Sequence, residues 1–307
     1  MGIRKTPMQK VLQFIVPELA FENNFLMNGM LGVASLDMQR LLPDPTTVRR
    51  QTVIYRAKAL QQYRQALPFV HMNSENYNAA LLMAILLVVL CSQDHPTSND
   101  ELTIVRWIIL YGGLRTVMKM GTFETVMSSK VGPIFRRYIT EVKSTPVVPV
   151  SLLNMVACIT PMDAEYASLK FYFQTLDDLA VVYASLGQDG VSNAFAIRVI
   201  TWPTYVTEEF TQLAKETRPR ALIILAHYLV FTKLVPDLWW MEGIADREIM
   251  IIARMISPEW LPFLDIPLQA VSLTKIEDIV SLILGQFNCN LNPGRYGVPS
   301  SLCIESI

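Results

Sequence analysis

The sequence predicts an all-α protein, and two observations support this fold class. Segments in which apolar residues recur every three or four positions follow one another along most of the chain. The eighteen prolines fall mainly between these segments, where they would end one helix before the next begins. No stretch alternates apolar and polar residues for long, so strands are not expected. We therefore predict a single multi-helix domain over residues 1–285 and a C-terminal tail over residues 286–307.

The individual helices follow from this periodicity, in order along the chain. They are predicted near residues 8–16, 20–40, 46–67, 74–92, 99–120, 131–143, 148–157, 162–186, 189–200, 204–216, 219–234, 237–256 and 272–285. The helix from 46 is expected to bury the face that carries Val53, Ala57, Leu60, Arg64 and Leu67. The helix from 162 is expected to bury the face that carries Tyr166, Leu169, Phe173, Leu176, Ala180 and Tyr183.

Two segments nearer the C-terminus have recognisable helix starts. Pro219 lies where a first-turn residue needs no backbone N–H, and Ala221–Phe231 carries no formal charge. Pro236 shortly precedes Trp239 and Trp240, which are expected to open the next helix. Adjacent helical positions point about 100° apart. One tryptophan is therefore expected to face the core and the other a groove.

The composition leaves apolar residues to spare. Hydrophobic residues make up 51% of the 307 residues and charged residues 17%, so some apolar surface could line a pocket or a homodimer interface. The longest apolar run, Ala79–Cys91, is too short to span a bilayer. No signal segment opens the chain, and the cysteines are scattered, which favours a reducing compartment. We expect a cytoplasmic protein without a membrane span, or a nuclear one if it is a regulator.

A series of short motifs resembles a known family. In the C-terminal third they are Arg218-Pro219-Arg220-Ala221-Leu222, Leu225-Ala226-His227-Tyr228, Trp239-Trp240 and a closing Trp260. Upstream they are Tyr63-Arg64-Gln65-Ala66-Leu67, Leu110-Tyr111-Gly112-Gly113-Leu114-Arg115, and Trp202-Pro203 followed by Glu208-Glu209-Phe210. From about residue 50 to about 267, the chain resembles the C-terminal regulatory domain of fungal zinc-cluster transcription factors of the sterol uptake control type. The resemblance implies an all-α fold that encloses a deep apolar pocket for a sterol.

The DNA-binding module of that family has no counterpart in this sequence. The module needs six cysteines in two close clusters, whereas this chain has four, at positions 91, 158, 289 and 303. The 26 basic residues are balanced by 27 acidic ones, so no basic arm is available for phosphates. We expect the ligand domain alone, with no metal site and no direct nucleic-acid partner.

His227 and Tyr228 are the candidate catalytic residues. An imidazole in an otherwise apolar helix could donate a hydrogen bond or act as an acid or base. The alternative is a core histidine bonded to a backbone carbonyl or a hydroxyl, which the shared motif favours. Candidate ligand-binding residues are Tyr166, Phe173, Phe231, Trp239, Trp240 and Met241, each of which could equally belong to the core. They would line a pocket bordered by helices 162–186, 219–234 and 237–256.

No motif indicates a cofactor. Glycine-rich nucleotide loops, nucleophile elbows and His-Glu-x-x-His are all missing. Asp177-Asp178 is the only acidic pair on a long helix, and it lacks the two intervening residues and second motif of magnesium-dependent prenyl cyclases. We expect the protein to work without a cofactor.

These observations leave three classes of function open. The first is a cofactor-free cyclase or pericyclase of fungal secondary metabolism, of the Diels–Alder type, which positions an apolar terpenoid or polyketide by shape. The second is a sterol-like ligand sensor that regulates transcription through a partner protein. The third is a purely structural dimerisation module. The missing zinc cluster favours the first over the second.

Overall fold

The computed structural model describes residues 7–92, 102–135 and 141–288, and within these ranges every regular element is helical. The predicted all-α class is thereby confirmed. The chain divides into two compact units, one of residues 1–97 with 105–138 and one of residues 98–104 with 139–307. The predicted single domain over 1–285 stays a prediction. Helix α16 continues to Asn288, and the rest of the predicted tail lies outside the described residues.

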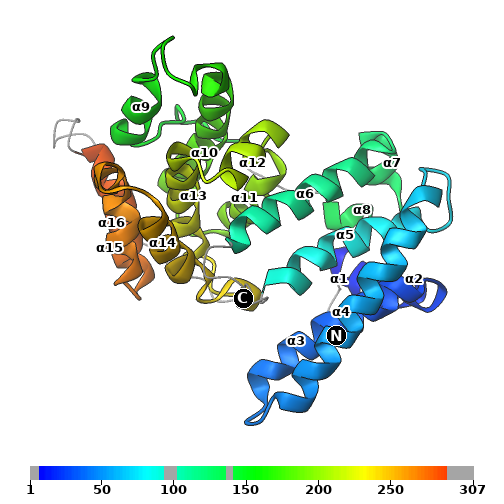
Figure 1. Ribbon diagram of the computed structural model, residues 1–307. Helices are drawn as coiled ribbons and strands as arrows, with labels where there is room; N and C mark the ends of the chain where they lie inside the picture. Colours follow the sequence, from blue (N-terminus) through cyan, green and yellow to red (C-terminus); the bar gives the residue numbers. More distant parts are fainter. Residues whose placement is uncertain (1–6, 93–101, 136–140, 289–307) are drawn as a thin grey trace. The chain divides into compact units, whose positions relative to one another are not determined.

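The first unit is built around α5 (Tyr77–Ser92), an uncharged helix that is buried along most of its length (Figure 1). The remaining elements of this unit are α1 (Pro7–Lys10), η1 (Val11–Ile15), α2 (Val16–Glu22), α3 (Asn24–Leu41), α4 (Thr46–Ala66), η2 (Leu67–Phe69), α7 (Phe123–Ser128), α8 (Gly132–Phe135) and most of α6 (Thr103–Lys119). Glycine allows α3 to approach α5 closely, since a Cβ on Gly32 would lie 2.7 Å from a methyl carbon of Leu90. The Tyr63 hydroxyl of α4 donates to the Ala80 carbonyl of α5 at 3.1 Å.

Helices α3 and α4 run antiparallel, as two hydrogen bonds between their side chains show. The Asn28 amide donates to Gln62, and the Gln39 amide donates to Thr52. The predicted buried face of α4 is wrong, because Val53, Ala57 and Arg64 are exposed. The face that packs instead carries Thr52, Ala59 and Tyr63, whose small or hydrogen-bonding side chains allow close contact with α3 and α5.

The second unit is built around α13 (Pro219–Thr232), whose residues from Ala221 onward are all buried. Its other elements are α9 (Val150–Ala157), η3 (Tyr166–Ser168), α10 (Leu169–Asp189), α11 (Asn193–Thr201), η4 (Trp202–Thr204), α12 (Glu208–Lys215), η5 (Trp239–Met241), α14 (Ile244–Met255), η6 (Pro258–Leu264), α15 (Asp265–Val271) and α16 (Ile276–Asn288). Helices α9, α10, α11, α12, α14 and α15 and the turn η6 all contact α13 (Figure 1). A helix surrounded on all sides needs no polar face, which explains its uncharged run.

Three of the predicted helix boundaries need correction. Trp239 and Trp240 lie in the short turn η5 rather than at the start of a helix, because Gly243, with φ of 72°, separates them from α14. Tyr166 lies in η3, ahead of α10, and is exposed, so it does not extend the buried face of that helix. Of the segment predicted as helix over 131–143, only α8 forms, 136–140 lie outside the described residues, and 141–143 are not helical.

Candidate ligand site around His227 and Trp202

Both ring nitrogens of His227 are bonded to protein groups. Nε2 lies 2.9 Å from the carbonyl oxygen of Phe263, and Nδ1 lies 3.1 Å from the hydroxyl of Tyr183. The carbonyl can only accept, so Nε2 carries the proton and Nδ1 accepts from the tyrosine hydroxyl. Burial lowers the pKa of His227 to about 4, and the bond to Phe263 opposes this shift. The imidazole is therefore neutral and links α10, α13 and η6.

Tyr228 is held just as firmly. Its hydroxyl donates to the carbonyl of Val199 at 2.9 Å, and its ring stacks on Trp202 with centroids 4.2 Å apart and planes 19° apart. Both side chains are about 1% exposed. A hydroxyl that already donates to a buried carbonyl has no second proton to offer a substrate. The stack instead forms a rigid aromatic layer between η4 and α13.

Phe231 belongs to the same core. Its ring meets that of Tyr183 edge to face at 4.7 Å and that of Phe195 at 6.2 Å. His227 and Phe231 are thus brought together through Tyr183, which contacts both of them. This cluster joins α10, α11 and α13.

The other predicted ligand-binding residues lie in more varied places. Tyr166 is 47% exposed, while Phe173 on α10 and Trp239 in η5 are half-buried. Trp240 and Met241 are buried in η5. Phe231 shares the neighbour Tyr183 with His227, and no such link is described for these five. Their role in binding a ligand stays a prediction.

A hollow of about 200 Å³ adjoins the aromatic layer in the second unit. Its lining comes from α10, α11, η4 and the residue just after η4, and consists of Asp178, Val181, Val182, Arg198, Thr201, Trp202 and Tyr205. Trp202, which stacks on Tyr228, forms part of its wall. The indole nitrogen of Trp202 is buried and has no hydrogen-bond partner in the described part of the chain. We call this space the Trp202 hollow.

Two ionisable side chains that line the Trp202 hollow, Asp178 and Arg198, have shifted pKa values. Burial raises the pKa of Asp178 to about 6, and the neighbouring Asp177 carboxylate adds to the rise. Burial lowers the pKa of Arg198, while the charges of Asp189 and Tyr205 oppose this shift. The hollow therefore combines an apolar wall with a carboxyl group that changes charge near pH 6. The sequence did not predict this lining. It drew attention to Asp178 as half of an acidic pair and to Trp202 as part of a shared motif, but to neither as a ligand-binding residue.

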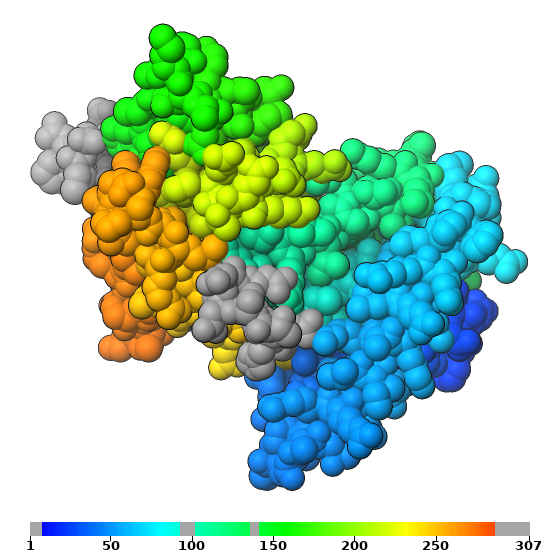
Figure 2. Space-filling model, viewed as in Figure 1, coloured from blue at the N-terminus to red at the C-terminus, as the bar shows by residue number. Residues whose placement is uncertain are grey.

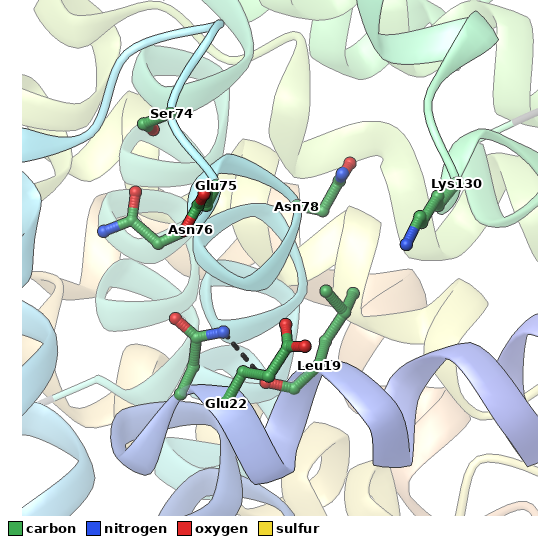
Figure 3. A pocket seen from close by; sticks show the side chains of 8 residues that line it. Leu19, Glu22, Ser74, Glu75, Asn76, Asn78 and Lys130 are labelled. Carbon is green, nitrogen blue, oxygen red and sulfur yellow. Dashed lines mark hydrogen bonds between the residues drawn. The ribbon is translucent and has the colours of Figure 1, made fainter.

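A larger, open hollow of about 890 Å³ lies in the first unit (Figure 3). Its lining is mostly polar and consists of Leu19, Glu22, Asn23, Ser74, Glu75, Asn76, Asn78 and Lys130. The amide of Asn23 donates to the Leu19 carbonyl at 2.9 Å, as the dashed line in Figure 3 shows. A polar lining differs from the apolar pocket that the sequence resemblance implies. This hollow does not match the predicted ligand site.

Two features are absent from residues 7–92, 102–135 and 141–288. Among these residues no group of three His, Cys, Asp or Glu side chains is placed to hold a metal ion. None of the helices described is both long and apolar enough to cross a bilayer. Cys91 is half-buried and Cys158 is exposed, and Cys289 and Cys303 lie outside the described residues.

Comparison with known proteins identifies relatives among fungal regulators. The chain is 21% identical, over 86% of its length, to a Zn(2)-C6 fungal-type transcription factor of Gibberella zeae. It is 22% identical, over 75% of its length, to each of two proteins named sterol uptake control protein 2, from Candida albicans and Saccharomyces cerevisiae. The predicted resemblance is confirmed. No family model matches the chain.

The chain is shorter than these relatives. The matched region spans 57% of the Gibberella zeae protein, 35% of the Candida albicans protein and 26% of the Saccharomyces cerevisiae protein. The similarity therefore concerns one region of each regulator. What the whole proteins do does not transfer directly to this chain.

Proposed function

We propose that this chain is a ligand-sensing region of a transcriptional regulator and that it binds an apolar, sterol-like molecule at the Trp202 hollow. The observation that carries the proposal is the position of this hollow against the Trp202–Tyr228 stack, in a chain related to sterol uptake control proteins. Binding pockets for small molecules are usually apolar with a few polar groups that fix orientation. The Trp202 hollow has both kinds of surface.

The chemistry of the lining fits an apolar molecule that ends in a hydroxyl or carbonyl group. Val181, Val182 and the Trp202 ring offer apolar surface to a hydrocarbon skeleton. Asp178 and Arg198 lie on the same lining and can accept from or donate to the polar end. Above about pH 6 the Asp178 carboxylate would accept a hydrogen bond from a ligand hydroxyl, and below it the protonated acid would donate one to a ligand carbonyl.

The hollow must widen to take such a ligand. Its volume of about 200 Å³ is smaller than the roughly 300–1,000 Å³ of typical ligand pockets. Tyr205 lines the hollow and is 50% exposed, so its side chain can move without disturbing the core. We propose that the ligand displaces Tyr205 and packs on the face of Trp202. Such a change at α10 and α11 would be the signal that the ligand is bound.

No observation favours the cyclase or pericyclase reaction expected from the sequence. The two candidate catalytic groups, His227 and Tyr228, are both engaged with backbone carbonyls. The relatives are transcription factors and sterol uptake control proteins. The regulator, which was the alternative, is therefore the function that we propose. Within this proposal the protein binds and releases its ligand unchanged, and its place of action is the nucleus.

A titration with a fluorescent sterol tests the proposal. Binding to the purified chain should change the fluorescence of the sterol, and the change should saturate at one equivalent. The variant Val181→Phe should weaken this binding at least about tenfold, because the larger side chain fills the hollow. Val181 is half-buried and lines the hollow, so the larger ring can extend into this space without displacing core side chains. Val150→Phe adds the same ring to the exposed face of α9 and should leave the affinity unchanged. Equal affinities for all three proteins would exclude the Trp202 hollow as the site.

A further inference from the structure

Helix α4 carries an unusual exposed face in the first unit. Between Thr46 and Ala66 it has five basic residues and no acidic one. Arg49, Arg50, Lys58 and Arg64 are exposed, and none of them makes an ion pair within the described residues. Like charges on one helix repel each other, and no ion pair of these four within the described residues offsets the repulsion.

Apolar side chains lie between these cations. Val53 is 51% exposed and Ile54 is 43% exposed. Residues four apart on a helix are neighbours on its surface, so Arg50, Ile54 and Lys58 form one row. Arg49, Val53 and Ala57 form the adjacent row. We call these two rows the α4 basic face. Light-blue atoms of this part of the chain are visible at the surface in Figure 2.

The opposite side of α4 holds the helix in place, which leaves this face free of a structural role. Thr52 is bonded to Gln39 of α3, and Tyr63 is bonded to Ala80 of α5. Substitutions on the exposed rows therefore do not remove these contacts. The helix has 21 residues, which gives a straight surface about 30 Å long.

We propose that the α4 basic face binds an acidic amphipathic helix of a partner protein. Carboxylates of the partner would pair with Arg49, Arg50 and Lys58, and its apolar residues would cover Val53 and Ile54. Charge complementarity selects this occupant, because the face offers only cations around its apolar centre. The proposal goes beyond ligand sensing, and it concerns a different unit of the chain.

Three other occupants fit the face less well. A second copy of the chain would set the same cations against each other, which is repulsive. Nucleic acid would neutralise the cations but would leave Val53 and Ile54 without an apolar partner. A membrane-bound helix lies with a continuous apolar face in the lipid, whereas each row here begins with an arginine.

The test is fluorescence anisotropy with a labelled 20-residue peptide that has leucines along one helical face and glutamates beside them. The double variant Arg50→Glu/Lys58→Glu should bind this probe at least about tenfold more weakly than the parent chain. The matched control, Lys215→Glu/Lys275→Glu, reverses two exposed cations of the second unit and changes the net charge equally. It should bind the probe within about twofold of the parent.

The apolar part of the face needs its own pair of variants. Ile54→Gln should weaken binding about threefold, because it removes buried apolar area from the complex. Met250→Gln is the control, since Met250 is exposed to the same 43% on α14. Circular dichroism of each variant should match that of the parent chain.

Two outcomes would overturn the proposal. One is equal binding of the probe by the α4 variants and their controls. The other is that the chain binds duplex DNA or phosphatidylserine vesicles more strongly than the peptide, and that Arg50→Glu/Lys58→Glu weakens binding of those ligands only. Neither outcome would affect the sterol titration, because its variants lie in the second unit.

Discussion

The two hydrogen bonds of His227 make a quantitative prediction about stability. His227→Ala removes the partners of the Phe263 carbonyl and the Tyr183 hydroxyl and leaves a cavity in the core. A buried group left without its partner costs about 1–3 kcal/mol, and a large-to-small core substitution costs about 2–5 kcal/mol. We expect a loss of about 4 kcal/mol or more at pH 7.5. His227→Gln, which can keep the bond to Phe263, should lose about 1–3 kcal/mol.

The pH dependence of these variants follows from the low pKa of His227. In the folded protein the imidazole stays neutral down to about pH 4, whereas in the unfolded chain it takes up a proton near its ordinary value of 6.5. Between these values the unfolded chain binds more protons, so stability falls as the pH falls from 6.5 to 4. The difference corresponds to about 3 kcal/mol. His227→Gln lacks this titration, so its stability should approach that of the parent chain as the pH falls to 4.

Urea unfolding followed by circular dichroism at pH 7.5, 6, 5 and 4 measures both effects. Subtracting the profile of His227→Gln from that of the parent removes the contributions of other groups, including Asp178. If the difference in unfolding free energy between the parent chain and His227→Gln stays constant across this range, the imidazole is not neutral and buried as described. A loss under 1 kcal/mol for His227→Ala at pH 7.5 would lead to the same conclusion.

Two further predictions concern packing and a buried carboxyl. Gly32→Ala should destabilise the protein by about 1–3 kcal/mol, because the new methyl group meets Leu90. Gly113→Ala places its methyl group in open space on α6 and should stabilise the protein by up to about 1 kcal/mol. Thermal unfolding of the two variants should therefore shift in opposite directions, and shifts of the same sign would contradict this packing. Glu248 is fully buried and accepts from the backbone N–H of Ile104 at 3.2 Å, so Glu248→Ala should cost about 2–4 kcal/mol in urea unfolding. An unchanged midpoint would show that this carboxyl does not hold the start of α6.

The helical class and the buried centre of the second unit could be predicted from local pattern. Pro219 and the uncharged run after it predicted α13 to within two residues at its end. A helix that is buried on every side carries no polar face, so its buried run is uncharged. The histidine on this helix was expected either as a reactive group or as a core residue. In the structure His227 has the hydrogen bonds expected of a core residue, to the carbonyl of Phe263 and the hydroxyl of Tyr183.

Other features depend on tertiary contacts that local pattern does not contain. Two faces of α4 have helical spacing, and only the bonds from Thr52 and Tyr63 to neighbouring helices decide which one is buried. The Trp239-Trp240 pair lies in a turn because Gly243 takes a left-handed conformation, which sequence alone does not require. The lining of the Trp202 hollow comes from separate elements, so no single motif could predict it.

Photo-crosslinking can show directly whether an apolar ligand binds against the Trp202–Tyr228 aromatic layer. The purified chain would be irradiated with a photoreactive sterol, with and without excess unlabelled sterol, and the modified peptides would be identified by mass spectrometry. We expect competed cross-links on residues 178–182 of α10 and on residues 198–205 of α11, η4 and Tyr205. Competed cross-links confined to the polar hollow lined by Leu19, Glu22 and Lys130 would contradict it. So would the absence of any cross-link that unlabelled sterol competes away.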